Sequence, residues 1–305
     1  VNKDKLTITA IDNVTITGEG TNCGFRVTGD NVTFTNLTIT GCYQSNAIKS
    51  TIYFTEQGKD SVMTVTGCKI SGNRCIVVAG NMAAADGKLA ITNCELTGVY
   101  PFNVGTGAIT IEVADSKLHG WSSYGDQTKS VAFTNCEFTK GTSDYNEVAA
   151  YTDTTFTNCT FAEGFTCHDQ KELSFRWTFA NCKIGEADLT LANFYDTFKG
   201  EDAAVWTNCA ATVNGTKSVT VKSGTFKFDV TAWVVEGYTA TDNGDGTWTV
   251  SVLPVYLGNG KVFKVNEWTK VADGFYQNAA TYDQSTDFAI TSLAGLKFVQ
   301  EFVNG

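Results

Sequence analysis

Short segments of alternating apolar and polar residues recur along most of the chain. Each contains an asparagine or a substitute for it, then a residue that is most often cysteine, a variable residue and an apolar residue. The second residue of each segment is used here as a marker. The markers are Val14, Leu37, Cys68, Cys94, Ser116, Cys136, Cys159, Cys182 and Cys209. A large apolar residue stands three positions before every marker, and an apolar residue stands two positions after it. This pattern predicts two short strands, separated by a corner, with inward apolar side chains.

The distance between markers identifies the kind of repeat. Successive markers are 20 to 31 residues apart, which fits one three-stranded coil of a parallel β-helix. A leucine-rich repeat would require a different leucine pattern and a helical half, and a propeller blade about 40 residues or more. We therefore expect an all-β fold, a right-handed parallel β-helix of nine or ten coils over residues 1–226. The hand follows from the general bias of parallel crossovers.

The residues at the predicted corners resemble those of a known family. Asparagine precedes most markers, and glycine stands four residues after Val14, Leu37, Cys68, Cys94 and Ser116. The asparagine corner and the inward apolar stacks resemble the pectate-lyase-like right-handed β-helix superfamily over about residues 1–225. The resemblance implies the fold and leaves the activity open, because that superfamily includes lyases, hydrolases, phage spikes and adhesins.

The period breaks after Cys209. Residues 218–226 are expected to form a last short coil, and 227–252 a β-hairpin cap turning at Asn243-Gly-Asp-Gly246. Residues 253–305 are expected to form a small, mainly β tail that ends in an amphipathic helix over 292–305. The stretch from Ser223 through the hairpin resembles the segment that closes β-helix regions in large surface proteins of anaerobic Gram-positive gut bacteria. The terminal helix is expected to dock either on the hairpin region of its own chain or on the first coil of another molecule. The second option would give head-to-tail association.

Charge and hydropathy restrict the partners. The formal net charge is −10, and the 22 Lys and Arg residues include only three arginines. Because nucleic acid binding requires clustered cations, we expect no nucleic acid partner. No run of 18 apolar residues is present, so we expect no membrane insertion. The chain begins directly in strand-like sequence without a signal peptide, and we interpret it as a mature or excised fragment of an extracellular or surface-attached protein.

Ten cysteines are present, six of them at marker positions. In-register parallel side chains have poor disulfide geometry, and free cysteine behaves as a small buried hydrophobe. Reduced core thiols are therefore favoured over disulfides or metal binding. The six marker cysteines are expected to form one stacked, inward column. Of the other cysteines, Cys23 and Cys42 are the best candidates for a disulfide bridge, and Cys75 and Cys167 also lie outside the column. We expect no metal site and no cofactor.

The sequence contains few groups of residues that could form a catalytic site. The chain has no Asp-Asp pair, and its two histidines, His119 and His168, should lie on different faces. The most enzyme-like cluster is His168 and Asp169 with Glu172 and Arg176, which we interpret as a solvated loop. We assign no catalytic residue and expect the protein not to be an enzyme.

Aromatic residues are the stronger functional signal. Tyr100, Phe102, Trp121 and Tyr124 occur on consecutive coils at positions that the marker pattern does not require to be apolar. If exposed they suit a glycan or protein ligand, whereas lateral packing on the coil is the alternative. We therefore expect a non-catalytic binding, adhesion or scaffold module that contacts a glycan or a surface protein. The alternatives are a polysaccharide lyase or glycoside hydrolase, and a structural stalk.

Overall fold

The structure is a computed structural model of the 305-residue chain. It describes residues 1–12, 14–18, 24–42, 50–79, 86–105, 108–125, 127–143, 147–169, 175–198, 208–252, 255–256, 262–263, 268–272, 275–278, 288–290, 292 and 294–297. The chain divides into two compact units, Val1–Ser218 and Val219–Gly305. Each unit is described by itself.

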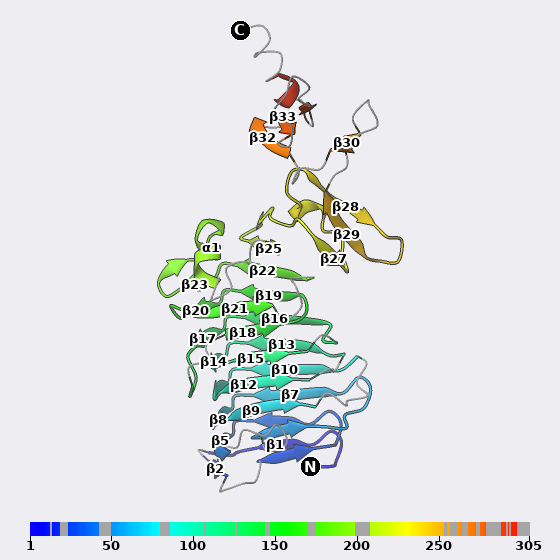
Figure 1. The fold of residues 1–305 in the computed structure, drawn as a ribbon. Helices are drawn as coiled ribbons and strands as arrows, with labels where there is room; N and C mark the ends of the chain where they lie inside the picture. The colour runs from blue at the N-terminus through cyan, green and yellow to red at the C-terminus, as the bar shows by residue number, and fades with distance from the viewer. Residues whose placement is uncertain are drawn as a thin grey trace. The chain divides into compact units, whose positions relative to one another are not determined.

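The first unit is a solenoid of three sheets built from short strands (Figure 1). The first sheet contains β1 (Thr7–Thr9), β4 (Thr33–Thr35), β7 (Val62–Thr66), β10 (Lys88–Thr92), β13 (Thr110–Ala114), β16 (Ser130–Thr134), β19 (Thr154–Thr157), β22 (Arg176–Ala180), β25 (Ala210–Val213) and β26 (Thr216–Lys217). The second contains β2 (Thr15–Thr17), β5 (Thr38–Cys42), β8 (Lys69–Gly72), β11 (Glu95–Thr97), β14 (Lys117–His119), β17 (Glu137–Thr139), β20 (Thr160–Phe161), β23 (Lys183–Ile184) and β24 (Ala187–Asp188). The third contains β3 (Phe25–Val27), β6 (Ile52–Phe54), β9 (Arg74–Val78), β12 (Tyr100–Val104), β15 (Ser122–Tyr124), β18 (Glu147–Ala150) and β21 (Thr166–Asp169).

The strands follow one another from sheet to sheet and pair in parallel with the next coil. The seven described strands of the third sheet are separated by six full turns, so the solenoid makes about six turns. The expected all-β parallel solenoid is confirmed, but nine or ten coils was too many. Nine strands from β1 to β25 are parallel in the first sheet, but the last coils are incomplete. The third sheet ends at β21 among the described residues, and β23 and β25 turn back as antiparallel hairpins with β24 and β26. The right-handed sense stays a prediction.

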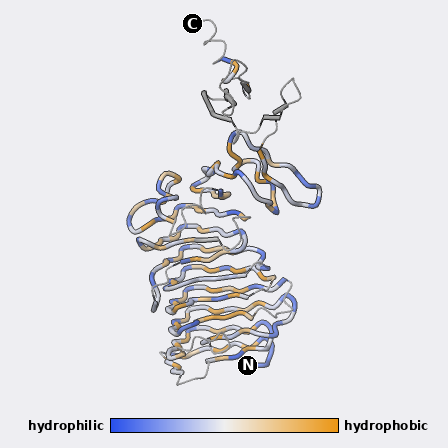
Figure 2. The backbone as a smooth tube through the Cα atoms, viewed as in Figure 1, coloured by the Kyte–Doolittle hydropathy of each residue, from blue (hydrophilic) through white to orange (hydrophobic). Residues whose placement is uncertain are grey.

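Inward side chains stack along the solenoid axis. Phe133, Cys136 and Phe138 are at most 2% exposed, as expected. The Phe133 and Phe156 ring centroids are 5.0 Å apart at an interplanar angle of 8°, and those of Phe156 and Phe179 are 4.9 Å apart at 10°. Hydrophobic and hydrophilic residues alternate along the coils (Figure 2). The period-two pattern of the sequence thus becomes a continuous apolar core.

The predicted corners are present between the first and second sheets. Their residues adopt positive φ angles of 50° to 62° at Asn36, Gly67, Asn93, Asp115, Asn135, Asn158 and Asn181. Asparagine, aspartate and glycine tolerate this left-handed conformation better than other residues. The sequence position before each marker therefore identified the corner correctly in these coils.

The first coil departs from the predicted alignment. Ile8, rather than Ile11, pairs with Phe34, while Ile16 pairs with Ile39 as expected. Ile11 is 81% exposed and Val14 is 48% exposed, so the inward positions assigned to both were wrong. The corner of this coil is longer than the others, and Asp12 rather than the marker asparagine takes the described positive φ angle. Asn13 lies outside the described residues.

The end of the solenoid also differs from the prediction. Ala211 pairs with Trp177 and Val213 with Phe179, so Cys209 does not occupy a marker position. Asn214 and Gly215 instead make the turn between β25 and β26, with φ angles of 49° and 80°. Trp206, assigned to this coil from the sequence, lies outside the described residues. Five cysteines, not six, therefore occupy the column.

A short helix covers the last stacked rings. Helix α1 (Leu191–Phe198) buries Phe194 and Phe198, whose ring centroids lie 5.5 and 5.2 Å from that of Phe179. Thr190 and Asn193 exchange hydrogen bonds between side chains and backbone amides at the helix start, as in a capping box. The sequence interpretation missed this helix because its eight residues are too few for a clear helical period.

The second unit begins with the predicted hairpin. Strands β28 (Tyr238–Asp242) and β29 (Trp248–Val252) are antiparallel, and β27 (Gly224–Phe226) pairs with β29. Residues 218–226 therefore do not form a last coil. The other described elements are a 3₁₀ helix (Thr231–Trp233), β30 (Val255–Tyr256), β31 (Val262–Phe263), β32 (Trp268–Ala272), β33 (Phe275–Asn278) and β34 (Phe288–Ile290). Of the expected terminal helix, residues 294–297 are helical; most of the rest lies outside the described residues.

Candidate functional site

A glycine corner between the second and third sheets positions three outward side chains. Gly72 and Gly98 precede Arg74 and Tyr100 by two residues, and Gly120 immediately precedes Trp121. A Cβ atom at Gly98 would lie 2.5 Å from the Gly72 carbonyl oxygen, and one at Gly120 would lie 2.3 Å from that of Gly98. A side chain at either position would collide with the backbone of the preceding coil, so only glycine permits this tight turn.

Arg74, Tyr100 and Trp121 form a continuous surface feature, which we call the aromatic strip. The Tyr100 and Trp121 rings stack with centroids 5.4 Å apart and an interplanar angle of 29°. The Arg74 guanidinium carbon lies 4.1 Å from the Tyr100 ring centroid, in cation–π geometry. All three residues are partly exposed, although the indole nitrogen of Trp121 is buried.

Two of the four aromatic residues expected at the ligand site lie elsewhere. Phe102 and Tyr124 are fully buried, and their ring centroids are 6.4 Å apart in a stacked arrangement. The Tyr124 hydroxyl hydrogen-bonds with the Thr154 hydroxyl at 2.6 Å. These residues therefore belong to the core, because they occupy inward positions of β12 and β15.

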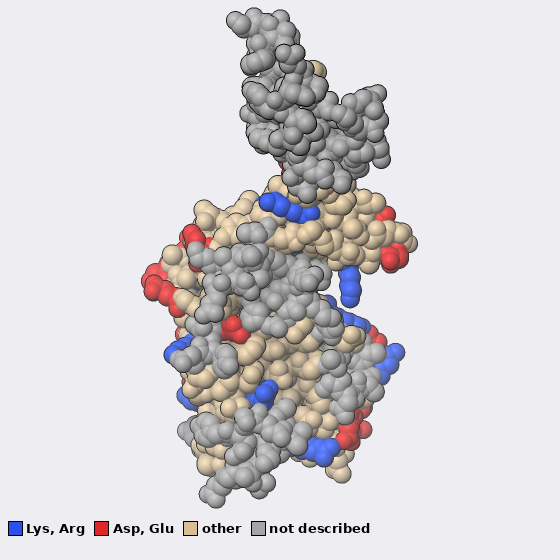
Figure 3. Space-filling model, in the orientation of Figure 1, with Lys and Arg blue, Asp and Glu red and all other residues tan. Residues whose placement is uncertain are grey.

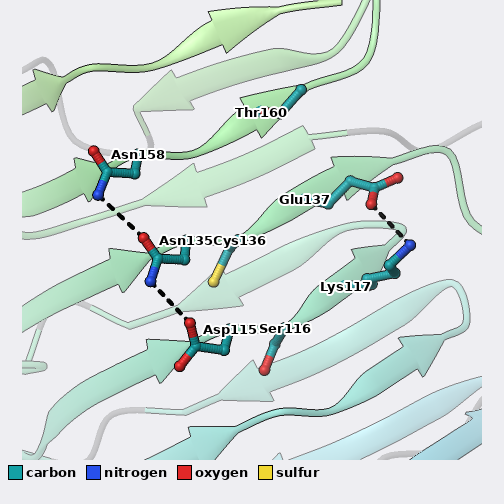
Figure 4. Close-up of a pocket in the computed structure, with 8 residues that line it drawn as sticks. All are labelled: Asp115, Ser116, Lys117, Asn135, Cys136, Glu137, Asn158 and Thr160. Carbon is teal, nitrogen blue, oxygen red and sulfur yellow. Dashed lines mark hydrogen bonds and ion pairs between the residues drawn. The ribbon is translucent and has the colours of Figure 1, made fainter.

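A shallow hollow lies over the asparagine corner and is the second candidate (Figure 4). Its volume is about 440 Å³, and its lining includes Asp115, Lys117, Asn135, Glu137 and Asn158. The Asn158 side-chain amide donates to Asn135 Oδ1 at 3.1 Å, and that of Asn135 donates to Asp115 Oδ1 at 2.8 Å. The chain of amide donors ends at Asp115, because an ionised carboxylate only accepts.

Lys117 and Glu137 form an ion pair at the hollow. Lys117 Nζ lies 3.1 Å from Glu137 Oε2, on strands that are neighbours in the second sheet. Ser116 replaces the marker cysteine here, and its hydroxyl donates to the Ala114 carbonyl at 2.6 Å. This coil thus departs from the repeat at two successive positions, Asp115 and Ser116, and it borders the hollow. The sequence interpretation treated Asp115 only as a corner residue.

The histidines lie on different sheets, as expected. His119 on β14 hydrogen-bonds through Nδ1 to the Thr139 hydroxyl, and its partial burial lowers its pKa, with Glu95 and Glu137 opposing that shift. His168 and Asp169 lie on β21, which pairs with β18; their side chains, and Glu172, lie outside what the structure describes. Arg176 pairs with Asp153 on the neighbouring coil.

Charged side chains are dispersed over the described surface, as the face in Figure 3 illustrates. Several pair across coils, such as Lys69 with Glu95 at 3.0 Å. Among the described residues, no group of three or more His, Cys, Asp or Glu side chains is arranged to hold a metal ion. In the same part of the chain, no helix is long and apolar enough to cross a membrane.

The fold defines the chain as a parallel β-solenoid. Comparison with family models, curated proteins and solved structures finds no match for the chain. The site geometry therefore carries the functional argument.

Proposed function

We propose that this chain is a non-catalytic binding module of an extracellular or surface-attached protein, related to the pectate-lyase-like β-helix superfamily. Its ligand would be a glycan or a protein of a cell surface, as in adhesins. The observation that carries the proposal is the aromatic strip of Arg74, Tyr100 and Trp121.

The composition of the strip favours recognition. Tryptophan, tyrosine and arginine are the residues most enriched among those that dominate binding energies at interfaces. Because the rings stack on each other and Arg74 lies on one of them, little side-chain entropy remains to be lost on binding.

Binding of the chain to glycan and protein arrays tests the proposal. We expect the double variant Tyr100→Ala/Trp121→Ala to bind its array ligand at least about 10-fold more weakly, or about 1.4 kcal/mol. The matched control is Tyr53→Ala, which removes a partly exposed tyrosine from an outward position of the same sheet. Equal binding by the double variant and the wild type would contradict the assignment of the strip.

The hollow supports a second candidate, a glycan-degrading enzyme. It contains two carboxylates, Asp115 and Glu137, and glycoside hydrolysis uses a pair of carboxyl groups on either side of the scissile bond. Turnover of pectins, glycosaminoglycans or mucin glycans that is lost in both Asp115→Asn and Glu137→Gln would establish this function. The engagement of these groups by Asn135 and Lys117 makes the binding module the favoured proposal.

A further inference from the structure

The cysteine column has a geometry that core packing does not require. It consists of Cys68, Cys94, Cys136, Cys159 and Cys182, which strand pairing places at equivalent positions of successive coils. Ser116 occupies the same position between Cys94 and Cys136. The column is therefore divided into a run of two thiols and a run of three, and all five thiols are free and buried.

Neighbouring cysteines within each run lie on adjacent rungs of the solenoid. Strand pairing places Cys68 next to Cys94, and Cys159 between Cys136 and Cys182. Each thiol also points toward backbone carbonyl oxygens; Cys136 Sγ, for example, lies 3.4 Å from the Thr134 oxygen and 3.5 Å from the Val113 oxygen. The sulfur atoms thus form rows parallel to the solenoid axis.

We propose that adjacent thiols of this column bind a soft, thiophilic monovalent cation such as Cu(I) in linear two-coordinate geometry. Parallel strands are spaced about 4.8 Å apart, and two metal–thiolate bonds of about 2.3 Å span about 4.6 Å. A metal between two successive rungs therefore fits the spacing without moving the backbone. No group of three or more ligands is gathered among the described residues, which disfavours ions that require four ligands, such as Zn²⁺.

Charge balance also suits a monovalent ion. Binding to two thiols releases one proton to water, leaving one thiolate and one thiol around the cation, with no electron transferred. The site is then neutral overall, which limits the cost of burying it. Cys136 lines the hollow, which gives an ion a route to the run of three thiols.

Silver(I), a redox-stable substitute for Cu(I), is the probe for the test. It is titrated into the intact chain with excess monothiol competitor, which removes singly coordinated ions, and bound ions are counted by native mass spectrometry. The runs of two and three thiols predict about two ions per wild-type chain. Cys159→Ser leaves only the Cys68–Cys94 pair and should bind about one. Ser116→Cys joins the runs into six thiols and should bind about three.

Cys75→Ala is the matched control, since Cys75 is a buried free thiol off the column; it should still bind about two ions. Circular dichroism checks that each variant folds, and the gain expected for Ser116→Cys does not depend on Cys159→Ser folding. The affinity should rise with pH, because binding releases a proton. A wild type that binds no silver, or equal ion counts in wild type, Cys159→Ser and Ser116→Cys, would overturn the proposal.

Discussion

At the scale of single residues, the corner asparagines contribute in two ways. Asn158 holds a φ angle of 53°, which costs most L-residues about 1–2 kcal/mol. Its side-chain amide also donates to Asn135 on the preceding coil. The backbone conformation is the larger contribution, because the amide hydrogen bond is exposed to water and therefore worth less than a buried one.

Substitutions at Asn158 separate these two contributions. We expect Asn158→Ala to lower the free energy of unfolding by about 1–2 kcal/mol, since alanine is strained at positive φ. Asn158→Gly should cost less, because glycine adopts this conformation without strain. Urea unfolding measures both, with Thr155→Ala as an outward control on β19. Equal destabilisation by alanine and glycine would show that the backbone conformation is not the larger contribution.

The corner residues also show how far the coil boundaries could be predicted from the sequence. Asparagine or glycine before the marker placed the corners of most coils, because few residues tolerate that conformation. In the first coil the extra corner residues shifted Ile11 and Val14 out of the core, and Ile8 took the inward position. Corner length leaves no periodic signal, so this coil was misaligned. Cys209 was wrongly assigned to a marker position for a related reason. The strand after it, β25, turns back at Asn214 and Gly215 and does not continue into another coil.

At the scale of elements, helix α1 protects the end of the aromatic stack. The last rings of a solenoid, and the strand edges around them, would otherwise meet water. Phe198 packs against Phe161 with ring centroids 5.2 Å apart and also against Phe179. The helix therefore acts as a cap within the first unit.

Removing the apolar face of α1 tests this role. We expect Phe194→Ser/Phe198→Ser to lower the free energy of unfolding by at least about 3 kcal/mol, since each substitution removes a buried ring. The exposed stack should also cause association that increases with concentration, measured by sedimentation velocity. Ala192→Ser changes an exposed position of the same helix and should do neither. A double variant as stable and as monomeric as this control would show that α1 caps nothing.

At the scale of the whole molecule, the solenoid divides side chains into an inward set that fixes the fold and an outward set that forms the surface. The marker pattern predicted the first set well. It did not locate the third strand of each coil, because no asparagine corner at fixed spacing marks that strand. Tyr100, Phe102, Trp121 and Tyr124 were therefore treated alike, although Phe102 and Tyr124 are core residues of β12 and β15. The hollow at Asp115 was missed because the distances between coils are not visible in the sequence.

Hydroxyl-radical footprinting of these four aromatic residues is the most direct test of the account, because it reports side-chain exposure residue by residue. We expect oxidation of Tyr100 and Trp121, which are partly exposed, and protection of Phe102 and Tyr124, which are fully buried. Addition of an array ligand should then protect Tyr100 and Trp121. Oxidation of Phe102 and Tyr124 at rates comparable to those of Tyr100 and Trp121 would contradict both the coil alignment and the proposed binding strip.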